Sequence, residues 1–223
     1  NRCGYTGKVF FIVDNEDKSV DQYIANFGSD KVIVFNKKAI ADTIDEGNNF
    51  DERRTITHAR NFCFEAAKQA GVKYFIQLDD DYVAFEYRHA NKEGTELMGR
   101  CILNIDKIIN LYLDFYKSTG FKSIAFAQGG DFIGGLNGGM VGKLKRKSMN
   151  SFFCSTDRPF QFVGAMNEDV NTYTTLGSRG VLFGTIPSVS LNQAATQSQS
   201  GGITNMYLKY GTYCKSFTTV MMQ

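Results

Sequence analysis

The stretch KYFIQLDDDYVAF, residues 73–85, runs from an apolar segment directly into three aspartates. Its aromatic and β-branched first half is typical of a buried strand that ends at these acids. Similar apolar runs at 8–14, 31–35 and 123–128 alternate with segments of helical periodicity. Such repeated strand–helix–strand units predict an α/β fold, with a mainly parallel mixed sheet flanked by helices.

The predicted helices have recognisable ends. Residues 19–28 carry apolar residues at helical spacing and close on Gly28, and Thr57 is a plausible N-cap for a helix that stops at Gly71. The other predicted elements are helices over 101–120 and 167–177, strands over 151–156 and 180–186, and a polar loop over 190–205.

Composition predicts a single globular domain over residues 1–223. The chain is 43% hydrophobic with a net charge of +2, and no apolar run approaches the roughly 18 to 20 residues that cross a bilayer. We therefore expect no membrane span and no signal peptide. The five scattered cysteines predict reduced thiols in a cytoplasmic setting. Either end of the chain is compatible with a cut, so a missing terminal segment is one expectation.

The three aspartates need compensation, because like charges this close repel one another. On a strand end Asp79 and Asp81 share a face, while Asp80 points elsewhere. A hard divalent cation such as Mg²⁺ or Mn²⁺, which prefers oxygen ligands and keeps substrate phosphates in its shell, would resolve the repulsion. The alternative interpretation is a solvated acidic turn.

The segment THARNFCFEAAKQAGVKYFIQLDDDY, residues 57–82, resembles the helix–strand signature of GT-A glycosyltransferases. Arg60 and Asn61 match the Arg-Asn pair of that family, and Asp79 and Asp81 match its DxD motif. The resemblance implies a GT-A-like fold and metal ligation by the two matched aspartates. The residues it implies at the nucleotide-sugar are Arg60, Asn61, Asp79 and Asp80.

A narrower resemblance rests on short motifs spread over residues 8–185. FIVDNED (11–17), ARN (59–61), QLDDDY (77–82) and NEDVNTY (167–173), with a glycine-rich strand, are similar to the TET-associated glycosyltransferases of phages. This family is proposed to modify hydroxymethylated pyrimidines in DNA. The resemblance implies a UDP-sugar donor, an acceptor such as 5-hydroxymethylcytosine, and the host cytoplasm as location. The donor half would be about 1–85 and the acceptor half about 86–223.

A second carboxylate pair, Glu168 and Asp169, opens the predicted helix 167–177. Acids in a first turn are stabilised by the helix dipole, so capping is one interpretation. The other is general-base catalysis on an acceptor hydroxyl. The resemblance favours the second, with Asp169 as the base of an inverting enzyme and Glu168 as an acceptor contact.

Two further positions follow from the same resemblance. Asp14, at the end of the first strand, is implied to cradle the donor nucleobase, although a capping role is equally plausible. Many GT-A enzymes supply a late histidine to the metal, but this chain has only His58 and His89. The ligand would lie beyond Gln223, or water or another group would replace it. We expect His58 on a helix surface.

The glycine-rich stretch 129–142 contains neither a P-loop nor a GxGxxG motif. It predicts either close approach of a bulky ligand or bulged strands. The basic residues that follow form a solvated face or contact DNA phosphates, and Tyr82 or Phe132 could stack on an extruded base if they do not serve only the core. These basic residues are Lys143, Lys145, Arg146 and Lys147.

The sequence alone leaves three alternative functions to consider. The same fold could act on a glycan, a protein or a small molecule. A nucleotidyltransferase normally shows a glycine-rich, lysine-containing signature near its first strand, which FFIVDNED at 10–17 lacks. A non-catalytic binding module for nucleotide-sugar or DNA is the alternative of another class.

Overall fold

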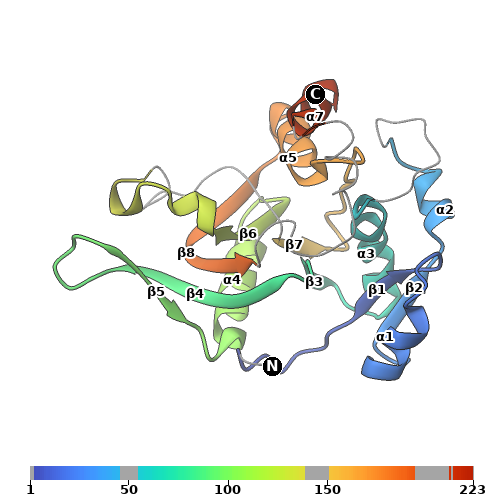
Figure 1. The fold of residues 1–223 in the computed structure, drawn as a ribbon, viewed down its shortest axis with the longest axis horizontal. Coiled ribbons are helices and arrows are strands. Elements are labelled where there is room, and N and C mark those ends of the chain that lie inside the picture. Colours follow the sequence, from blue (N-terminus) through green and yellow to red (C-terminus); the bar gives the residue numbers. More distant parts are fainter. Residues whose placement is uncertain (1–2, 46–54, 139–150, 194–210, 212, 223) are drawn as a thin grey trace. The chain divides into compact units, whose positions relative to one another are not determined.

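The computed structural model of the protein describes residues 3–45, 55–138, 151–193, 211 and 213–222 (Figure 1). The chain forms two compact units. Unit 1 comprises residues 1–7, 76–154 and 180–199, and unit 2 comprises residues 8–75, 155–179 and 200–223. Because each unit combines separate segments, the units do not coincide with the predicted halves on either side of residue 85. The single-domain organisation stays a prediction.

Strands and helices alternate through most of the chain, as the sequence predicts. The strands are β1 (Phe11–Asp14), β2 (Val32–Phe35), β3 (Tyr74–Leu78), β4 (Tyr82–Ala90), β5 (Leu97–Cys101), β6 (Ser123–Gln128), β7 (Ser151–Ser155) and β8 (Phe183–Gln193). The helices are α1 (Val20–Phe27), α2 (Lys37–Ala41), α3 (Thr57–Gln69), α4 (Ile105–Ser118), α5 (Glu168–Ser178) and α7 (Cys214–Met222), with 3₁₀ turns η1 (Gly129–Phe132) and η2 (Gly135–Asn137). Among the described residues, no helix has the length and apolar character that crossing a bilayer requires.

The prediction of a mainly parallel sheet is wrong. β1 and β2 pair in parallel as a separate two-stranded sheet, and a six-stranded sheet has the order β3-β7-β6-β8-β4-β5. In that sheet β6 and β8 are parallel, whereas β4 pairs antiparallel with both β5 and β8, and β6 pairs antiparallel with β7. The antiparallel pairs arise in part because β4 and β5 form a hairpin, which the sequence patterns did not predict.

The hairpin is closed by a turn over residues 91–96. The Asn91 side-chain oxygen accepts from the backbone N–H groups of Thr95 at 2.8 Å and Glu96 at 3.2 Å, and Gly94 has a φ of 68°. Asparagine and glycine are residues that favour such turns, so the local signal is present in the sequence. The predicted polar loop over 190–205 is also wrong at its start, because β8 continues to Gln193.

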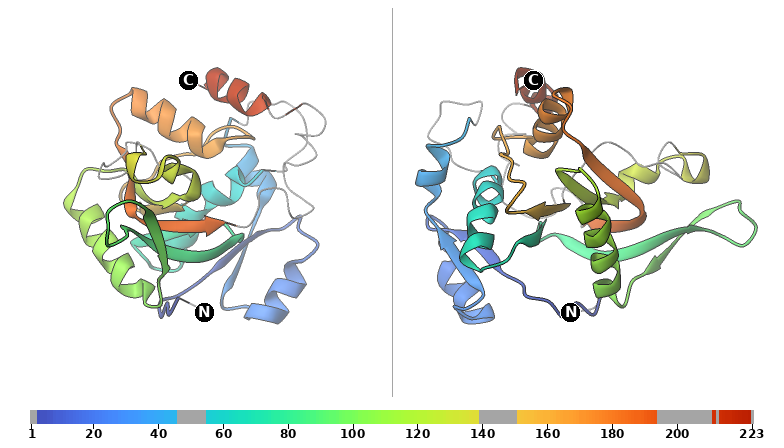
Figure 2. Two further views of the ribbon diagram at one scale, coloured as in Figure 1. Left: turned by 60° about the vertical axis from the view of Figure 1, so that its left-hand side comes forward. Right: turned by 180° about the vertical axis from the view of Figure 1, so that it is seen from behind.

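Aromatic side chains make the core of unit 1, where α4 lies against the sheet (Figures 1 and 2). The Tyr112 ring of α4 is 4.8 Å from the Phe126 ring of β6 and 5.6 Å from the Phe153 ring of β7. Phe126 also contacts Phe85 of β4 edge to face, at 5.4 Å. These large rings bury apolar surface from four elements in one cluster, which fixes the helix on the sheet.

In unit 2, α3 packs on the small sheet through Phe62, whose ring stacks at 4.9 Å on Phe35 of β2. The helix ends near Gly71, whose φ of 66° suits glycine, as expected. Thr57 is not the N-cap: it is the first helical residue, and its hydroxyl donates to the Gly164 carbonyl at 2.7 Å. The Thr57 hydroxyl thus serves a tertiary contact to the segment before α5.

The burial of Tyr112 predicts how the free energy of unfolding changes at alkaline pH. Burial raises the pKa of its phenol, because the charged form is disfavoured away from water. The unfolded chain, with a tyrosine pKa near 10, loses this proton first, so the free energy of unfolding should fall above pH 10 by about 1.4 kcal/mol per pH unit for this group. Urea unfolding at pH 9, 10 and 11 should show a steeper loss for the wild type than for Tyr112→Phe. Equal pH slopes in the two proteins would contradict the prediction.

Candidate active site

The three aspartates form the connection between β3 and β4 in unit 1. They are not strand residues, since β3 ends at Leu78 and β4 begins at Tyr82. The Asp81 carboxylate accepts from Nε2 of Gln193, at 3.1 Å and 2.8 Å to its two oxygens. The last residue of β8 therefore fixes this carboxylate.

The donor set of this acid turn fits a divalent cation of the Mg²⁺ or Mn²⁺ type. Such ions are held in many nucleotide sites by one or two carboxylates, with water and substrate phosphate completing the shell. Asp79 and Asp81 supply two carboxylates directly after a strand. Within the described residues, no group of three or more acidic, histidine or cysteine side chains forms a fuller metal cage. A cation held at this turn would therefore take only part of its shell from the described residues.

The second predicted cluster lies in unit 2, where a buried ion pair joins α3 to α5. Nε of Arg60 is 3.0 Å from Oε1 of Glu168, and the two residues are only 4% and 6% exposed. The guanidinium also lies over the Phe162 ring, 5.6 Å from its centroid. Glu168 is therefore more than a cap on α5, since its carboxylate neutralises a buried cation from another helix.

Asn61, the partner of Arg60 in the sequence motif, makes a two-point contact with the backbone of Phe162. Its Nδ2 donates to the Phe162 carbonyl at 2.9 Å, and its Oδ1 accepts from the Phe162 N–H at 2.8 Å. This pattern imitates a strand bridge and satisfies buried backbone groups. The geometry thus shows the Arg-Asn pair holding the segment that leads into α5.

The start of α5 is built by that segment. The residue before it, Asn167, has a left-handed φ of 60°, and Gly164 has a φ of 86° in close contact with Asn171. Asp169 is 7% exposed, and its Oδ1 accepts from the Val170 N–H at 2.8 Å. Within the part of the chain that the structure describes, Oδ2 of Asp169 has no hydrogen-bond partner. One oxygen thus accepts from a first-turn N–H of α5, and the other has no partner among the described residues.

Asp14 ends β1 and is paired with a cation that the sequence patterns did not single out. Nζ of Lys37 lies 3.1 Å from Oδ2 of Asp14, and Oδ1 of Asp14 accepts from the Glu16 N–H at 3.0 Å. Lys37 begins α2 two residues after the last residue of β2, the parallel neighbour of β1. Carboxyl ends of paired parallel strands meet at one edge, so this order along the chain was an available signal.

The remaining predicted residues have different outcomes. His58 was expected at a helix surface, and this is wrong: its side chain is fully buried in α3. Tyr82 is half-buried and pairs with Gln193 in the register of β4 and β8. The glycine-rich stretch forms the turns η1 and η2 as far as the structure describes it. The four basic residues lie outside the described residues: Lys143, Lys145, Arg146 and Lys147.

Comparison with known proteins decides the family. The sequence profile of the TET-associated glycosyltransferases matches residues 1–202, which include both clusters of candidate residues. The chain belongs to this family. A search of curated proteins and a search of solved structures each found no match.

Membership identifies the protein as a glycosyltransferase, as the sequence resemblance implied. In this TET-associated glycosyltransferase the candidate residues fall into two groups. The acid turn and Tyr82 belong to unit 1, whereas Asp14, the Arg-Asn pair and the acids of α5 belong to unit 2. Each group is organised within its own unit by contacts that involve residues outside the short motifs, namely Gln193, Lys37 and Phe162.

The buried pair predicts strong coupling between Arg60 and Glu168. Removing one partner leaves the other charge in a buried site without it, which typically costs about 3 to 5 kcal/mol. Arg60→Met and Glu168→Leu should each destabilise the protein by this order, and the double variant by less than the sum. Urea unfolding of the wild type, the two single variants and the double variant measures this double-mutant cycle. Glu65→Gln, which removes an exposed pair with Lys68, is the control and should cost less than about 1 kcal/mol. Additive single losses would contradict the coupling.

Proposed function

We propose that this protein transfers a sugar, a hexose or an N-acetylhexosamine, from a UDP-sugar to the hydroxyl of 5-hydroxymethylcytosine in DNA, with Mn²⁺ or Mg²⁺ and with inversion. The observation that supports it most is the acid turn at the end of β3, in a chain whose family is that of the TET-associated glycosyltransferases. The family name, TET-associated glycosyltransferase, and the motif resemblance together support a hydroxymethylated pyrimidine in DNA as the acceptor.

The donor is assigned to residues at the strand ends. Asp79 and Asp81 would hold the cation, which when bound neutralises charge on the leaving diphosphate. Asp80, beside them in the turn, and Asp14, held by Lys37, are the candidates for contacts to the ribose and base of the nucleotide. Direct contact of Arg60 and Asn61 with the donor stays a prediction. Their geometry supports a positioning role, because both hold the segment before α5.

Asp169 is the proposed general base. Its Oδ2 would accept the proton of the acceptor hydroxymethyl group as that oxygen attacks the anomeric carbon. The bond from the anomeric carbon to the diphosphate breaks in the same displacement, and the nucleoside diphosphate leaves with that electron pair. A single displacement of this kind inverts the configuration. The free oxygen of Asp169 and the neutralised Glu168 beside it support the assignment, with Glu168 as the acceptor contact.

The experiment combines the protein with Mn²⁺, a panel of UDP-sugars and DNA that contains 5-hydroxymethylcytosine or 5-hydroxymethyluracil. Mass spectrometry of the digested nucleosides then detects transfer. A hexose or N-acetylhexosamine increment that needs both the metal and the modified base supports the proposal. UDP release without a DNA product would indicate a glycan, protein or small-molecule acceptor. The absence of both signals, UDP release and a DNA product, would favour a non-catalytic binding module.

Two conservative substitutions test the roles of the carboxylates. Asp81→Asn removes a cation ligand, and Asp169→Asn removes the base, which should lower kcat about 10² to 10⁴-fold. Asp42→Asn is the matched control, because this carboxylate is exposed and pairs only with Lys38 on α2 among the described residues. Full activity of Asp169→Asn, or a product with retained configuration, would refute the base assignment.

The basic residues after the glycine-rich stretch make a separate prediction about DNA binding. For each phosphate that a side chain no longer neutralises, the slope of log K against log salt concentration should become shallower by about 0.7 to 0.9. Alanine at all four positions should therefore weaken DNA binding and flatten its salt dependence, without changing UDP-sugar affinity. An unchanged slope in fluorescence-anisotropy titrations would assign these residues to a solvated face. The positions are Lys143, Lys145, Arg146 and Lys147.

A further inference from the structure

Helix α7 packs against α5 in unit 2 (Figures 1 and 2). It lies beyond residues 1–202, which the family profile matches, so membership of the family says nothing about its role. Nδ2 of Asn167, the residue directly before α5, donates to Oγ1 of Thr219 in α7 at 2.7 Å. One residue earlier, Sδ of Met166 lies 3.6 Å from Sγ of Cys214. Helix α7 thus contacts the two residues that lead into α5.

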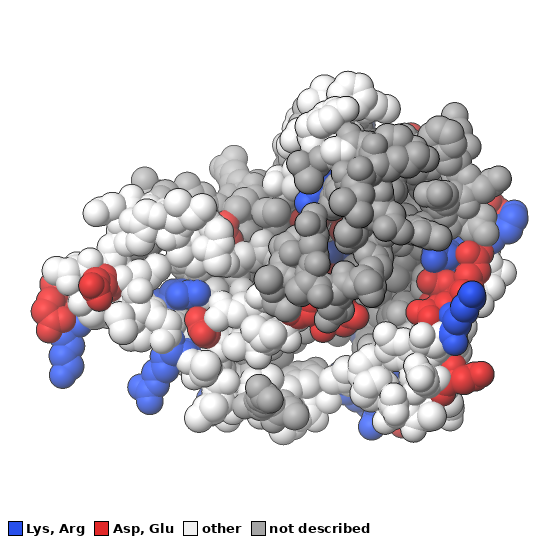
Figure 3. Space-filling model, viewed as in Figure 1, with Lys and Arg blue, Asp and Glu red and all other residues white. Residues whose placement is uncertain are grey.

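The side chains that α7 buries are not its large apolar ones. Phe217, Val220 and Met221 are exposed and form an apolar outer surface (Figure 3). Thr218 and Thr219 are buried, each with only 9% of its surface exposed. Burial of large apolar side chains therefore contributes little to holding this helix. Its position depends on the polar contacts that its buried face makes.

The backbone of Asn167 needs a contact that holds it. Its φ is 60° and its ψ is 31°, and among the described residues it is the only one other than glycine with a positive φ. This left-handed conformation is disfavoured for L-amino acids and persists where the surroundings hold it. Asparagine tolerates it better than most residues, because its short side chain can form a hydrogen bond nearby. Thr219 supplies the partner for that hydrogen bond.

The side chain of Asn167 does not cap α5. Before a helix, the side-chain oxygen of an asparagine normally accepts from an N–H group of the first turn. No such bond forms within the part of the chain that the structure describes, although the Asn167 carbonyl accepts the Asn171 N–H at 2.8 Å and so begins the helix. The side-chain amide donates to α7 instead. This hydrogen bond therefore links two helices.

The hydroxyl of Thr219 serves two partners at once. It accepts from Asn167, and it donates to the Lys215 carbonyl in the preceding turn of α7 at 3.3 Å. Because the hydroxyl hydrogen is used by the carbonyl, a lone pair of the oxygen is left for the amide. Successive hydrogen bonds of this kind strengthen one another. Valine has nearly the same shape as threonine but can neither donate nor accept.

Two other helices thus hold the start of α5. Glu168 is held by its ion pair with Arg60 of α3, and Asn167, one residue earlier, is held by Thr219 of α7. The ion pair fixes a side chain, whereas the contact with Thr219 fixes a backbone conformation. Asp169 is the next residue, so the direction of its carboxylate depends on both contacts.

We infer that Thr219 is a positioning residue for Asp169: through Asn167, it holds the left-handed turn from which α5 starts. The inference rests on the proposed function, because it takes Asp169 as the general base. A displacement of about 1 Å at a reacting group can lower the rate about 10²-fold. Loss of the contact should affect the chemical step more than donor binding, since the proposed cation ligands Asp79 and Asp81 belong to unit 1.

The first test compares the two adjacent threonines of α7. Thr219→Val should lower kcat for transfer to hydroxymethylcytosine DNA by about 10- to 100-fold, with an unchanged KM for the UDP-sugar. Thr219→Ser keeps the hydroxyl and should retain most of the wild-type kcat. Thr218→Val is the matched control, because this hydroxyl donates at 2.8 Å to the Cys214 carbonyl of the same helix. It should keep the wild-type kcat. Equal losses of kcat in the two valine variants would overturn the inference and assign Thr219 to the stability of α7 alone.

The second test asks whether the effect passes through Asn167. Asn167→Gly removes the amide but keeps a residue that accepts a positive φ, whereas Asn167→Ala removes both. We expect the alanine variant to lose more kcat than the glycine variant. In the Asn167→Gly background, Thr219→Val should lower kcat by less than about twofold, because the contact is already lost. Full additivity of the two single losses would contradict a shared contact.

Activity of the wild type separates this inference from the proposed function. A loss of kcat in Thr219→Val, with a urea-unfolding midpoint that matches Thr218→Val, supports the positioning role. Sugar transfer by the wild type, together with full kcat in Thr219→Val, overturns the positioning role and leaves the proposed function in place. Absence of any transfer by the wild type overturns both.

Discussion

The buried ion pair between Arg60 and Glu168 is the constraint on which the candidate base depends. Both groups lie almost entirely away from water, where neither charge is tolerated without the other. Because Arg60 belongs to α3 and Glu168 is the first residue of α5, the pair fixes where the second helix begins. Asn61 and Phe162 add a backbone-like bridge to the same connection. Asp169, the next residue, takes its position from that start.

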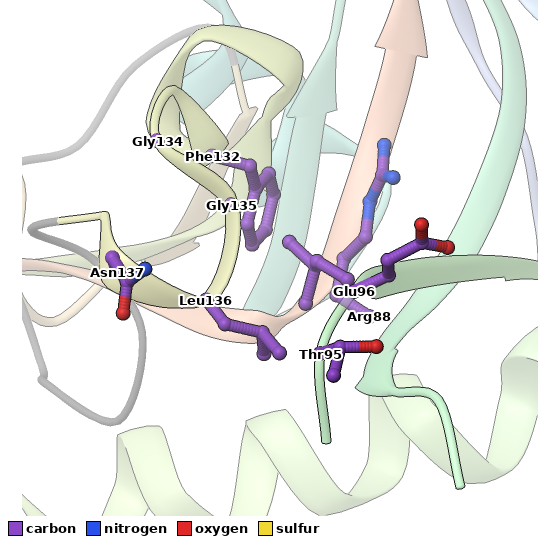
Figure 4. Close-up of a pocket in the computed structure, with 9 residues that line it drawn as sticks. Arg88, Thr95, Glu96, Phe132, Gly134, Gly135, Leu136 and Asn137 are labelled. Atoms are coloured by element: carbon purple, nitrogen blue, oxygen red, sulfur yellow. The ribbon is translucent and has the colours of Figure 1, made fainter. Parts of the chain in front are cut away.

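The two units hold their candidate carboxylates in position by different interactions. In unit 2 a buried cation and a left-handed residue before α5 hold the helix start. In unit 1 an amide from the end of β8 holds Asp81. Farther along β4, hydrogen bonds and an ion pair hold the Arg88 guanidinium (Figure 4). In each unit, fixed neighbours orient a polar side chain. This reduces the conformational entropy that the side chain loses when a substrate binds.

Much of this organisation was predictable from local patterns. The helices α1 and α3 end near Gly28 and Gly71, where glycine takes a positive φ, and the strand before the three aspartates follows from its run of apolar residues. The hairpin of β4 and β5 was missed, although the asparagine and glycine of its turn are visible, because its strands are only partly buried or exposed and so lack the continuous apolar run of a core strand.

Local sequence patterns were enough to establish the family, the order of most elements and the two sets of carboxylates, because glycine ends, apolar periodicity and short motifs belong to neighbouring residues. Sheet order and strand direction required the tertiary structure, since these depend on which distant strands bury one another's faces. The partners of the acids, Lys37, Gln193 and Arg60, also required it, because the fold brings each of them to its carboxylate. His58 shows the same limit: helical spacing cannot tell which face of α3 will be covered.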